Sequence, residues 1–246
     1  MPKGLLLLHA FPLDVSMWTP QLTEFRGEVA VVAPNFPGFG GTALSGEVST
    51  MDLAADGAAH EAAAAGLDQV VVCGLSMGGY VALAFWRKFR DRAVGLVLAN
   101  TRAGADDEAA RERRRALAAR LRAEGNGFLV ESPPPLLSAD APAELWAHVR
   151  SIIAAQSAEA LAGASLGMAE RPDSTPDLEG IDVPTLVITS TGDTLIPPEA
   201  TSPMSDQIPG AQLEVIQGAG HLSNLQAPQE FNRLLRTHLV RCGLST

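Results

Sequence analysis

The stretch Val70-Val71-Val72-Cys73-Gly74-Leu75-Ser76-Met77-Gly78-Gly79 decides how the rest of this chain is interpreted. An apolar run leads into the pattern G-x-S-x-G, and a helical stretch follows it. In this strand–turn–helix setting the serine lies on a sharp, strained turn that exposes its hydroxyl. Small residues are needed two before and two after it, because the strand and helix backbones nearly touch. Ser76 is therefore the candidate nucleophile.

The composition indicates one globular domain. With 246 residues, of which 46% are hydrophobic, the chain suits a single α/β domain. Its net charge of −10 would repel phosphate backbones and anionic lipid, so we expect neither a nucleic-acid nor a membrane partner. The apolar run 5–8 is too short for a signal peptide, and no segment approaches the ~18 apolar residues of a membrane span. We therefore expect a soluble, cytoplasmic protein and make no prediction of its oligomeric state.

The two cysteines, Cys73 and Cys242, are too few for a disulfide framework. Cys73 ends an expected strand and is interpreted as a small buried hydrophobe. A catalytic thiol is not expected, because Ser76 already occupies the nucleophile position.

Short apolar runs alternate with helical patterns along most of the chain. Runs this continuous are typical of strands buried on both faces of a parallel sheet. The expected strands are 5–8, 29–33, 70–73, 94–99, 184–189 and 212–216, and the expected helices are 51–65, 77–89, 198–208 and 228–240. The alternation predicts an α/β, doubly wound, mostly parallel sheet that binds its ligand beyond the carboxyl ends of the strands.

One region departs from this alternation. Residues 104–176 carry no strand pattern, only Ala-, Arg- and Glu-rich helix formers interrupted by the proline run 133–135. We expect a helical cap there, inserted into a core formed by residues 1–103 and 177–246. The charged cluster in this region is interpreted as a solvated helix face in preference to a basic binding patch; it comprises Glu108, Arg111, Glu112, Arg113, Arg114 and Arg115.

Two further residues complete a candidate catalytic triad with Ser76. A serine hydroxyl needs a base to take its proton and a third group to orient that base. His221 lies in the glycine-rich turn 218–222, just beyond the last expected strand, and Asp193 lies in a loop after the preceding one. The order Ser, Asp, His, with each residue on a strand-end loop, favours this assignment over a purely structural role for Asp193.

Other polar residues are less suited to these roles. Asn100 follows the expected strand 94–99, where an acid could have stood, but an amide supplies no charge. His60, His148 and His238 fall within helical patterns, where surface or packing roles are expected.

Ester chemistry on a serine also needs two N–H donors for the negative charge that develops on the carbonyl oxygen. One should be the backbone N–H of Met77, at a helix N-terminus. The second should come from the loop after the first strand, where Phe11 is the candidate, since Pro12 has no N–H. His9, beside this loop, is expected to have a structural hydrogen-bonding role.

These motifs together resemble the α/β-hydrolase superfamily across nearly the whole chain. Within it, the chain looks most like the small carboxylesterases, the 3-oxoadipate enol-lactonases and the cofactor-free haloperoxidases or perhydrolases. It departs from the usual pattern in having Ala10 in place of a glycine and Asn35 in place of an aspartate. The motifs that carry the resemblance are His9–Leu13, Pro34–Gly40, Gly74–Gly79, Gly192-Asp193 and Gly218–His221.

The resemblance implies hydrolysis of a small ester or lactone through an acyl-enzyme, with no metal or organic cofactor. Candidate pocket residues are Phe11, Pro12, Met77, Leu195, Ile196 and Leu222. They are mostly apolar, which favours a modest, uncharged substrate.

Several alternatives use the same motifs. A proline at the position of Pro12 accompanies peroxide use in the perhydrolase relatives. An enol-lactonase would need a cationic group for its substrate's carboxylate, which Arg102 or an arginine of the cap could supply. Hydrolysis of a C–C bond in a diketone uses the same triad, and a ligand-binding protein on this fold is a non-enzymatic alternative.

Overall fold

The protein is built around one parallel sheet, as a computed structural model of residues 1–244 shows. The last two positions of the predicted core range 177–246 lie outside the described residues. Six strands run in the order β2-β1-β3-β4-β5-β6, and every neighbouring pair is parallel. The strands are β1 (Lys3–Leu8), β2 (Val31–Val32), β3 (Gln69–Leu75), β4 (Ala93–Ala99), β5 (Thr185–Ser190) and β6 (Gln212–Ile216). This arrangement confirms the predicted fold class.

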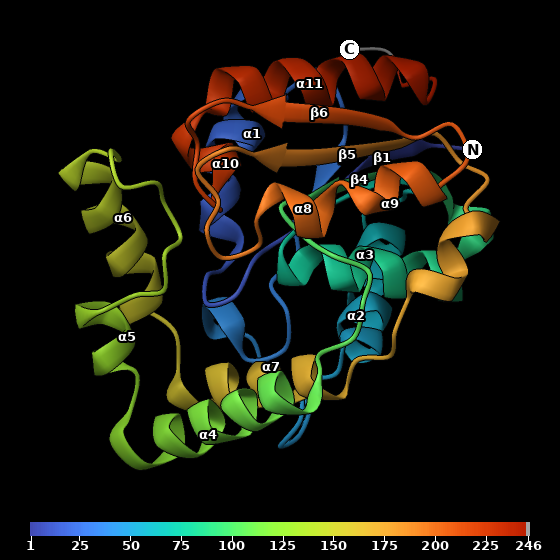
Figure 1. The fold of residues 1–246 in the computed structure, drawn as a ribbon. Helices are drawn as coiled ribbons and strands as arrows, with labels where there is room; N and C mark the ends of the chain where they lie inside the picture. The colour runs from blue at the N-terminus through green and yellow to red at the C-terminus, as the bar shows by residue number, and fades with distance from the viewer. Residues whose placement is uncertain (245–246) are drawn as a thin grey trace.

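Helices cover both faces of the sheet (Figure 1). α2 (Met51–Ala64) and α3 (Met77–Lys88) pack on one face, and α11 (Pro228–Arg241) packs on the other beside α1 (Thr19–Glu24). Short helices α8 (Pro198–Thr201), α9 (Pro203–Gln207) and α10 (Ser223–Gln226) occupy the remaining connections. The expected helix 198–208 is thus two helices, because Pro203 lacks the N–H that would continue the first one.

The edge strands differ from the expectation that every strand is buried on both faces. Four of the five residues of β6 are exposed, and only Ile216 is buried. β2 has just two residues, both partly exposed. An edge strand has a neighbour on one side only, so its apolar sequence does not guarantee burial.

Residues between β4 and β5 include four α-helices beyond the carboxyl ends of the strands (Figure 1). These are α4 (Glu108–Glu124), α5 (Gly127–Glu131), α6 (Ala143–Ala154) and α7 (Ala158–Glu170). α4 and α7 pack side by side. We call this group the α4–α7 segment.

No single helix in residues 1–244 has the length and apolarity to cross a membrane, although α6 and α7 would pass that test as a pair bent by 94°.

Both lysines of the chain lie on the amino-terminal side of the sheet. Lys3 is the first residue of β1, and Lys88 is the last residue of α3, which begins at the opposite, carboxyl side. A 12-residue helix is about 18 Å long. The two ammonium groups are therefore well separated from the strand ends that carry Ser76, Asp193 and His221.

Candidate active site

Ser76 lies between β3 and α3 in a backbone conformation that non-glycine residues rarely adopt, with φ 57° and ψ −117°. Such strain persists only where surrounding contacts fix it. Here the Ser76 N–H donates to the carbonyl of Ala99 at 2.9 Å, and the Thr101 hydroxyl donates to the Ser76 carbonyl at 2.8 Å. The end of β4 thus holds the turn in place, and the serine side chain borders a cavity.

The glycines around Ser76 are required by close backbone contacts. A Cβ on Gly74 would lie 2.1 Å from the carbonyl oxygen of Gly78. A Cβ on Gly78 would lie 2.0 Å from the carbonyl oxygen of Leu8. These distances give the physical reason for the G-x-S-x-G pattern.

Asp193 and His221 are in direct contact. His221 Nδ1 lies 2.8 Å from Asp193 Oδ2, and both side chains are fully buried. A carboxylate can only accept, so Nδ1 carries the proton and the lone pair of the neutral ring is on Nε2. The other carboxylate oxygen accepts from the backbone N–H groups of Leu195 and Ile196, each at 2.9 Å. The acid is thus held in one orientation by its own turn.

Asn100 adds a further contact to this acid. Its side-chain amide donates to Asp193 Oδ2 at 2.9 Å and to the Ser190 hydroxyl at 2.7 Å. Its carbonyl oxygen accepts from the Ser223 hydroxyl at 2.6 Å, which ties it to the loop that carries His221. Sequence reasoning excluded Asn100 as the acid and did not foresee that it supports the acid.

The structure brings the predicted base and acid together, but it does not pair the predicted nucleophile with the base. Within residues 1–244, His221 Nε2 is buried and has no hydrogen-bond partner. Hydrogen bonds between nucleophile and base are often long in unliganded enzymes and shorten when substrate binds. Nε2 is therefore the ring atom available to take a proton.

Two backbone N–H groups are placed as the predicted oxyanion donors would be. Met77 is the first residue of α3, and Phe11 borders the same cavity as Ser76. Neither N–H donates a hydrogen bond within residues 1–244. Ala10, which stands where the resembled family usually has glycine, causes no backbone strain, because it is not among the residues with positive φ.

His9 supports the loop that carries Phe11. Its Nε2 accepts from the Phe36 N–H at 3.0 Å, so Nδ1 carries the proton and donates to the Ala10 carbonyl at 3.1 Å. Burial lowers the pKa of His9 to about 4. The ring is therefore neutral near pH 7 and has both nitrogens occupied, as its expected structural role requires.

The buried thiols take no part in the site. Burial raises the pKa of Cys73 well above its ordinary value and that of Cys242 to about 11. Both thiols are free and remain protonated at neutral pH.

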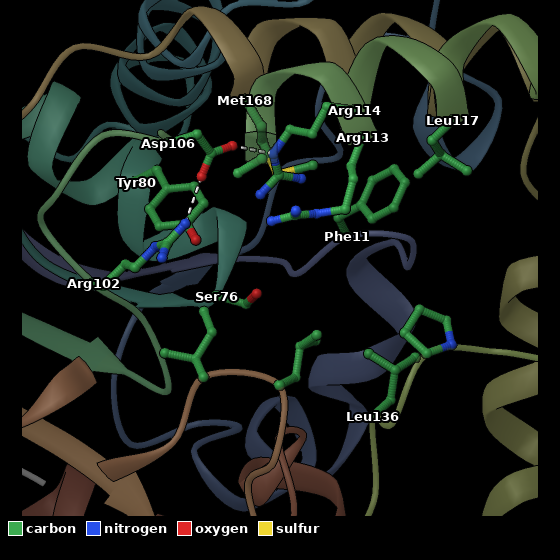
Figure 2. Close-up of a pocket in the computed structure, with 14 residues that line it drawn as sticks. Phe11, Ser76, Tyr80, Arg102, Asp106, Arg113, Arg114, Leu117, Leu136 and Met168 are labelled. Carbon is green, nitrogen blue, oxygen red and sulfur yellow. Dashed lines mark hydrogen bonds and ion pairs between the residues drawn. The ribbon is translucent and has the colours of Figure 1, made fainter. Parts of the chain in front are cut away.

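The cavity above Ser76 has a volume of about 380 Å³ and lies between the sheet edge and the α4–α7 segment (Figure 2). Phe11, Leu195 and Ile196 line it, as the sequence predicts, whereas Pro12, Met77 and Leu222 are buried and do not. The lining residues that sequence reasoning did not name as pocket residues include Tyr80, Asp106, Arg113, Arg114, Leu117, Pro134, Leu136 and Met168.

The lining is more polar than expected, and the interpretation of the arginine cluster as a solvated face is wrong in part. Arg113 and Arg114 line the cavity, and so does Arg102. Arg113 lines the cavity but is itself exposed, whereas Arg114 is half-buried and pairs with the buried Asp106. Arg115 behaves as expected, since it is exposed and pairs with Glu108 at 2.8 Å. The spacing of the lining positions 110, 113, 114 and 117 is that of one helix face and was the available signal.

Comparison with known proteins agrees with this fold. A profile of the alpha/beta hydrolase family matches residues 5–234, so the chain belongs to that family. A thermophilic esterase from Thermogutta terrifontis, solved with malate bound, is 41% identical, superposes with a TM-score of 0.93, and is matched over 98% of this chain and 92% of its own.

More distant relatives carry other names. 3-Oxoadipate enol-lactonase 2 from Acinetobacter baylyi is 25% identical over 97% of this chain and 89% of its own length. A putative carbamate hydrolase from Escherichia coli is 28% identical over 92% of this chain and 86% of its own. The similarity therefore extends over the whole fold.

Proposed function

We propose that the protein is a serine hydrolase that cleaves small carboxylic esters through an acyl-enzyme. The observation that carries this proposal is the 2.8 Å contact between Asp193 and His221, with Nε2 left unpaired; the chain also holds Ser76 on a strained turn between strand and helix. Such a set supplies a nucleophile, a base and an orienting acid. The esterase from Thermogutta terrifontis, at 41% identity, supports the choice of ester.

The reaction divides into acylation and deacylation. Ser76 Oγ attacks the ester carbonyl while His221 Nε2 takes the hydroxyl proton, and the carbonyl oxygen becomes an anion next to the N–H groups of Phe11 and Met77. The C–O bond to the alcohol then breaks, and His221 returns the proton to the leaving oxygen. In the second half a water loses a proton to His221 and attacks the acyl carbon. The carboxylic acid leaves, and Ser76 recovers its proton.

Asp193 has an orienting part in both halves. Its carboxylate keeps the Nδ1–H tautomer and stabilises the imidazolium that forms in each transition state. Because Leu195, Ile196 and Asn100 hold the carboxylate, this stabilisation needs no rearrangement when charge develops.

A p-nitrophenyl ester series from acetate to decanoate tests the proposal. Turnover of the short esters by the wild type should fall by a factor of about 10⁴ or more in Ser76→Ala. Ser151→Ala is the matched control, because Ser151 is exposed on α6 and its hydroxyl bonds only to the carbonyl of His148. Activity retained in Ser76→Ala, or absent from a folded wild type, would refute the proposal.

Lactone hydrolysis is the second candidate. A lactone is an internal ester, so the same steps apply and the leaving alcohol remains attached to the acid. The enol-lactonase from Acinetobacter baylyi, matched over 97% of this chain, favours this reaction. A comparison of kcat/KM for δ-valerolactone and ethyl acetate distinguishes the two, since a lactonase should prefer the ring by tenfold or more.

A further inference from the structure

Three arginines face the cavity that contains Ser76, although the chain as a whole has a net charge of −10. Arg102 follows β4, and Arg113 and Arg114 lie on α4 (Figure 2). Asp106 is the one acidic residue among those that line the cavity. This concentration of positive charge within an acidic protein calls for a physical explanation.

Asp106 accounts for only part of the charge. Its buried carboxylate pairs with Arg102 and Arg114, as the dashed lines in Figure 2 mark, and with the buried Arg171 at 2.8 Å. Burial by itself would raise the pKa of Asp106, but Arg171 and Arg114 hold it well below its usual range. One carboxylate thus serves three guanidinium groups, which leaves two positive charges without a counter-ion.

Arg113 differs from its neighbours on α4. Within residues 1–244 it makes no ion pair and no side-chain hydrogen bond, whereas Arg111, Arg114 and Arg115 each pair with a carboxylate. Figure 2 shows its guanidinium directed into the cavity above Ser76. Across the same cavity, Arg102 is also a lining residue, but it pairs with Asp106. The unused donors that the cavity offers to an anion are therefore those of Arg113.

Resting on the proposed ester hydrolysis, we propose that the substrates of this site carry a free carboxylate, which Arg113 binds through its guanidinium. A guanidinium and a carboxylate match in a two-bond geometry, and such pairs are stronger than neutral hydrogen bonds. Arg102 adds positive charge from the facing side. The substrate class is thus half-esters of dicarboxylic acids, or lactones and esters with an acidic side chain. This class differs from the modest, uncharged substrate that the apolar candidate residues of the sequence favour.

The carboxylate is a spectator in the chemistry. No bond to it forms or breaks, and it stays with either the acyl part or the alcohol part of the ester. Arg113 acts by holding the substrate while Ser76 attacks the ester carbonyl. Its removal should therefore raise KM for an anionic substrate more than it lowers kcat.

The test compares substrates matched in size and different in charge. One pair places the charge on the acyl side: mono-p-nitrophenyl glutarate against p-nitrophenyl pentanoate. The other places it on the alcohol side: 4-acetoxybutanoate against butyl acetate. The wild type should have the higher kcat/KM for the anionic member of one pair. That pair identifies whether the carboxylate belongs to the acyl side or to the alcohol side of the ester. Arg113→Gln should lower that preference about tenfold or more, because a hydrogen bond between two charged groups is lost.

Arg115→Gln is the matched control, since Arg115 is on the same helix and pairs with Glu108 outside the cavity. The preference should be unchanged in this variant. No preference for the anion in either pair, or the same preference in Arg113→Gln, would overturn the proposal. Turnover of none of the four substrates would refute the ester hydrolase and not the anion site.

A binding measurement separates these two failures. Calorimetric titration with glutarate measures the affinity of the anion site, and it needs no turnover because glutarate has no ester bond. Glutarate should bind the wild type and Arg115→Gln, with weakened binding in Arg113→Gln and at higher salt. Equal binding by all three proteins, or none by the wild type, would overturn the anion site whatever the enzyme assays show.

Discussion

The two walls of the cavity hold their polar groups in different ways. On the sheet-edge wall, formed by Phe11, Ser76, Leu195 and Ile196, the acid behind the surface is fully paired: Asp193 accepts four hydrogen bonds from four different residues. On the helical wall, formed by Arg113, Arg114, Leu117 and Met168, positive charge exceeds negative charge and Arg113 is unpaired. The acid that orients the catalytic base is thus fixed before substrate binds. The helical wall, in contrast, keeps the guanidinium of Arg113 free to bind a substrate.

Breaking the sheet-edge wall should have the largest effect. Asp193→Asn should lower kcat for a short p-nitrophenyl ester by a factor of about 10³ to 10⁴, because an amide stabilises neither the Nδ1–H tautomer nor the imidazolium. Asp173→Asn is the matched control, since Asp173 also accepts a backbone N–H in a turn but is exposed. A rate within threefold of the wild type would mean that the acid is another residue.

Breaking the helical wall should affect stability instead. Asp106→Asn removes the carboxylate shared by Arg102, Arg114 and Arg171 and leaves buried charge unpaired, which costs about 3–5 kcal/mol of unfolding free energy. Urea denaturation measures the loss. Asp140→Asn, an exposed change in the same segment, should cost less than about 0.5 kcal/mol. Equal midpoints for the two variants would contradict the shared role of Asp106.

The stability of the sheet-edge wall should also depend on pH through His9. His9 lies buried beneath the sheet-edge wall, and burial lowers its pKa to about 4. Between its ordinary value and pH 4 the unfolded chain takes up a proton that the folded protein does not, so stability falls as the pH falls. The loss from this residue reaches about 3 kcal/mol at pH 4, at 1.36 kcal/mol per unit.

Urea unfolding at several pH values checks this expectation. His9→Asn should show a shallower decline of unfolding free energy with acidity than the wild type. His148→Gln, an exposed change on α6, is the control and should follow the wild type. His238, whose pKa burial also lowers to about 4, and Asp106, whose pKa is held below its usual range, both contribute to the decline that remains in His9→Asn. An unchanged slope in His9→Asn would mean that His9 is not held neutral.

The smallest expected effect concerns Asn100, a positioning residue. Asn100→Gly removes the donor to Asp193 and tolerates the positive φ of 45° at this position. We expect kcat to fall about tenfold, since one hydrogen bond to a charged group is lost. The downfield NMR resonance of the His221 Nδ1 proton should move as well. If the resonance does not move, Asn100 does not act on His221 through Asp193, and its role is only to pack in the fold.

The sheet-edge wall was predictable from the sequence because its motifs are local. The G-x-S-x-G stretch requires its own turn geometry, and Asp193 and His221 each follow an apolar strand that brings them to the same edge. The helical wall was not predictable in the same way. Arg113 and Arg115 are two residues apart in one charged run and both are exposed, yet only Arg113 lines the cavity, whereas Arg115 pairs with Glu108 outside it. The helical spacing of positions 110, 113, 114 and 117 marks them as one face, but the packing of α4 against α7 decides that this face points inward.

The extents of the edge strands were beyond local sequence for a similar reason. β2 was expected over five residues and forms two, and β6 has the apolar pattern of a buried strand but is largely exposed. Position at the edge of the sheet depends on strand order, which is a property of the whole chain.

The placement of the lysines has a practical consequence for attaching the protein to a surface. Coupling through lysine side chains can use only Lys3 and Lys88, because the chain has no other lysine. Both lie on the amino-terminal side of the parallel sheet. A resin activated for amines would therefore hold every molecule in nearly the same orientation, with the mouth of the cavity directed toward the bulk solution and accessible to solute.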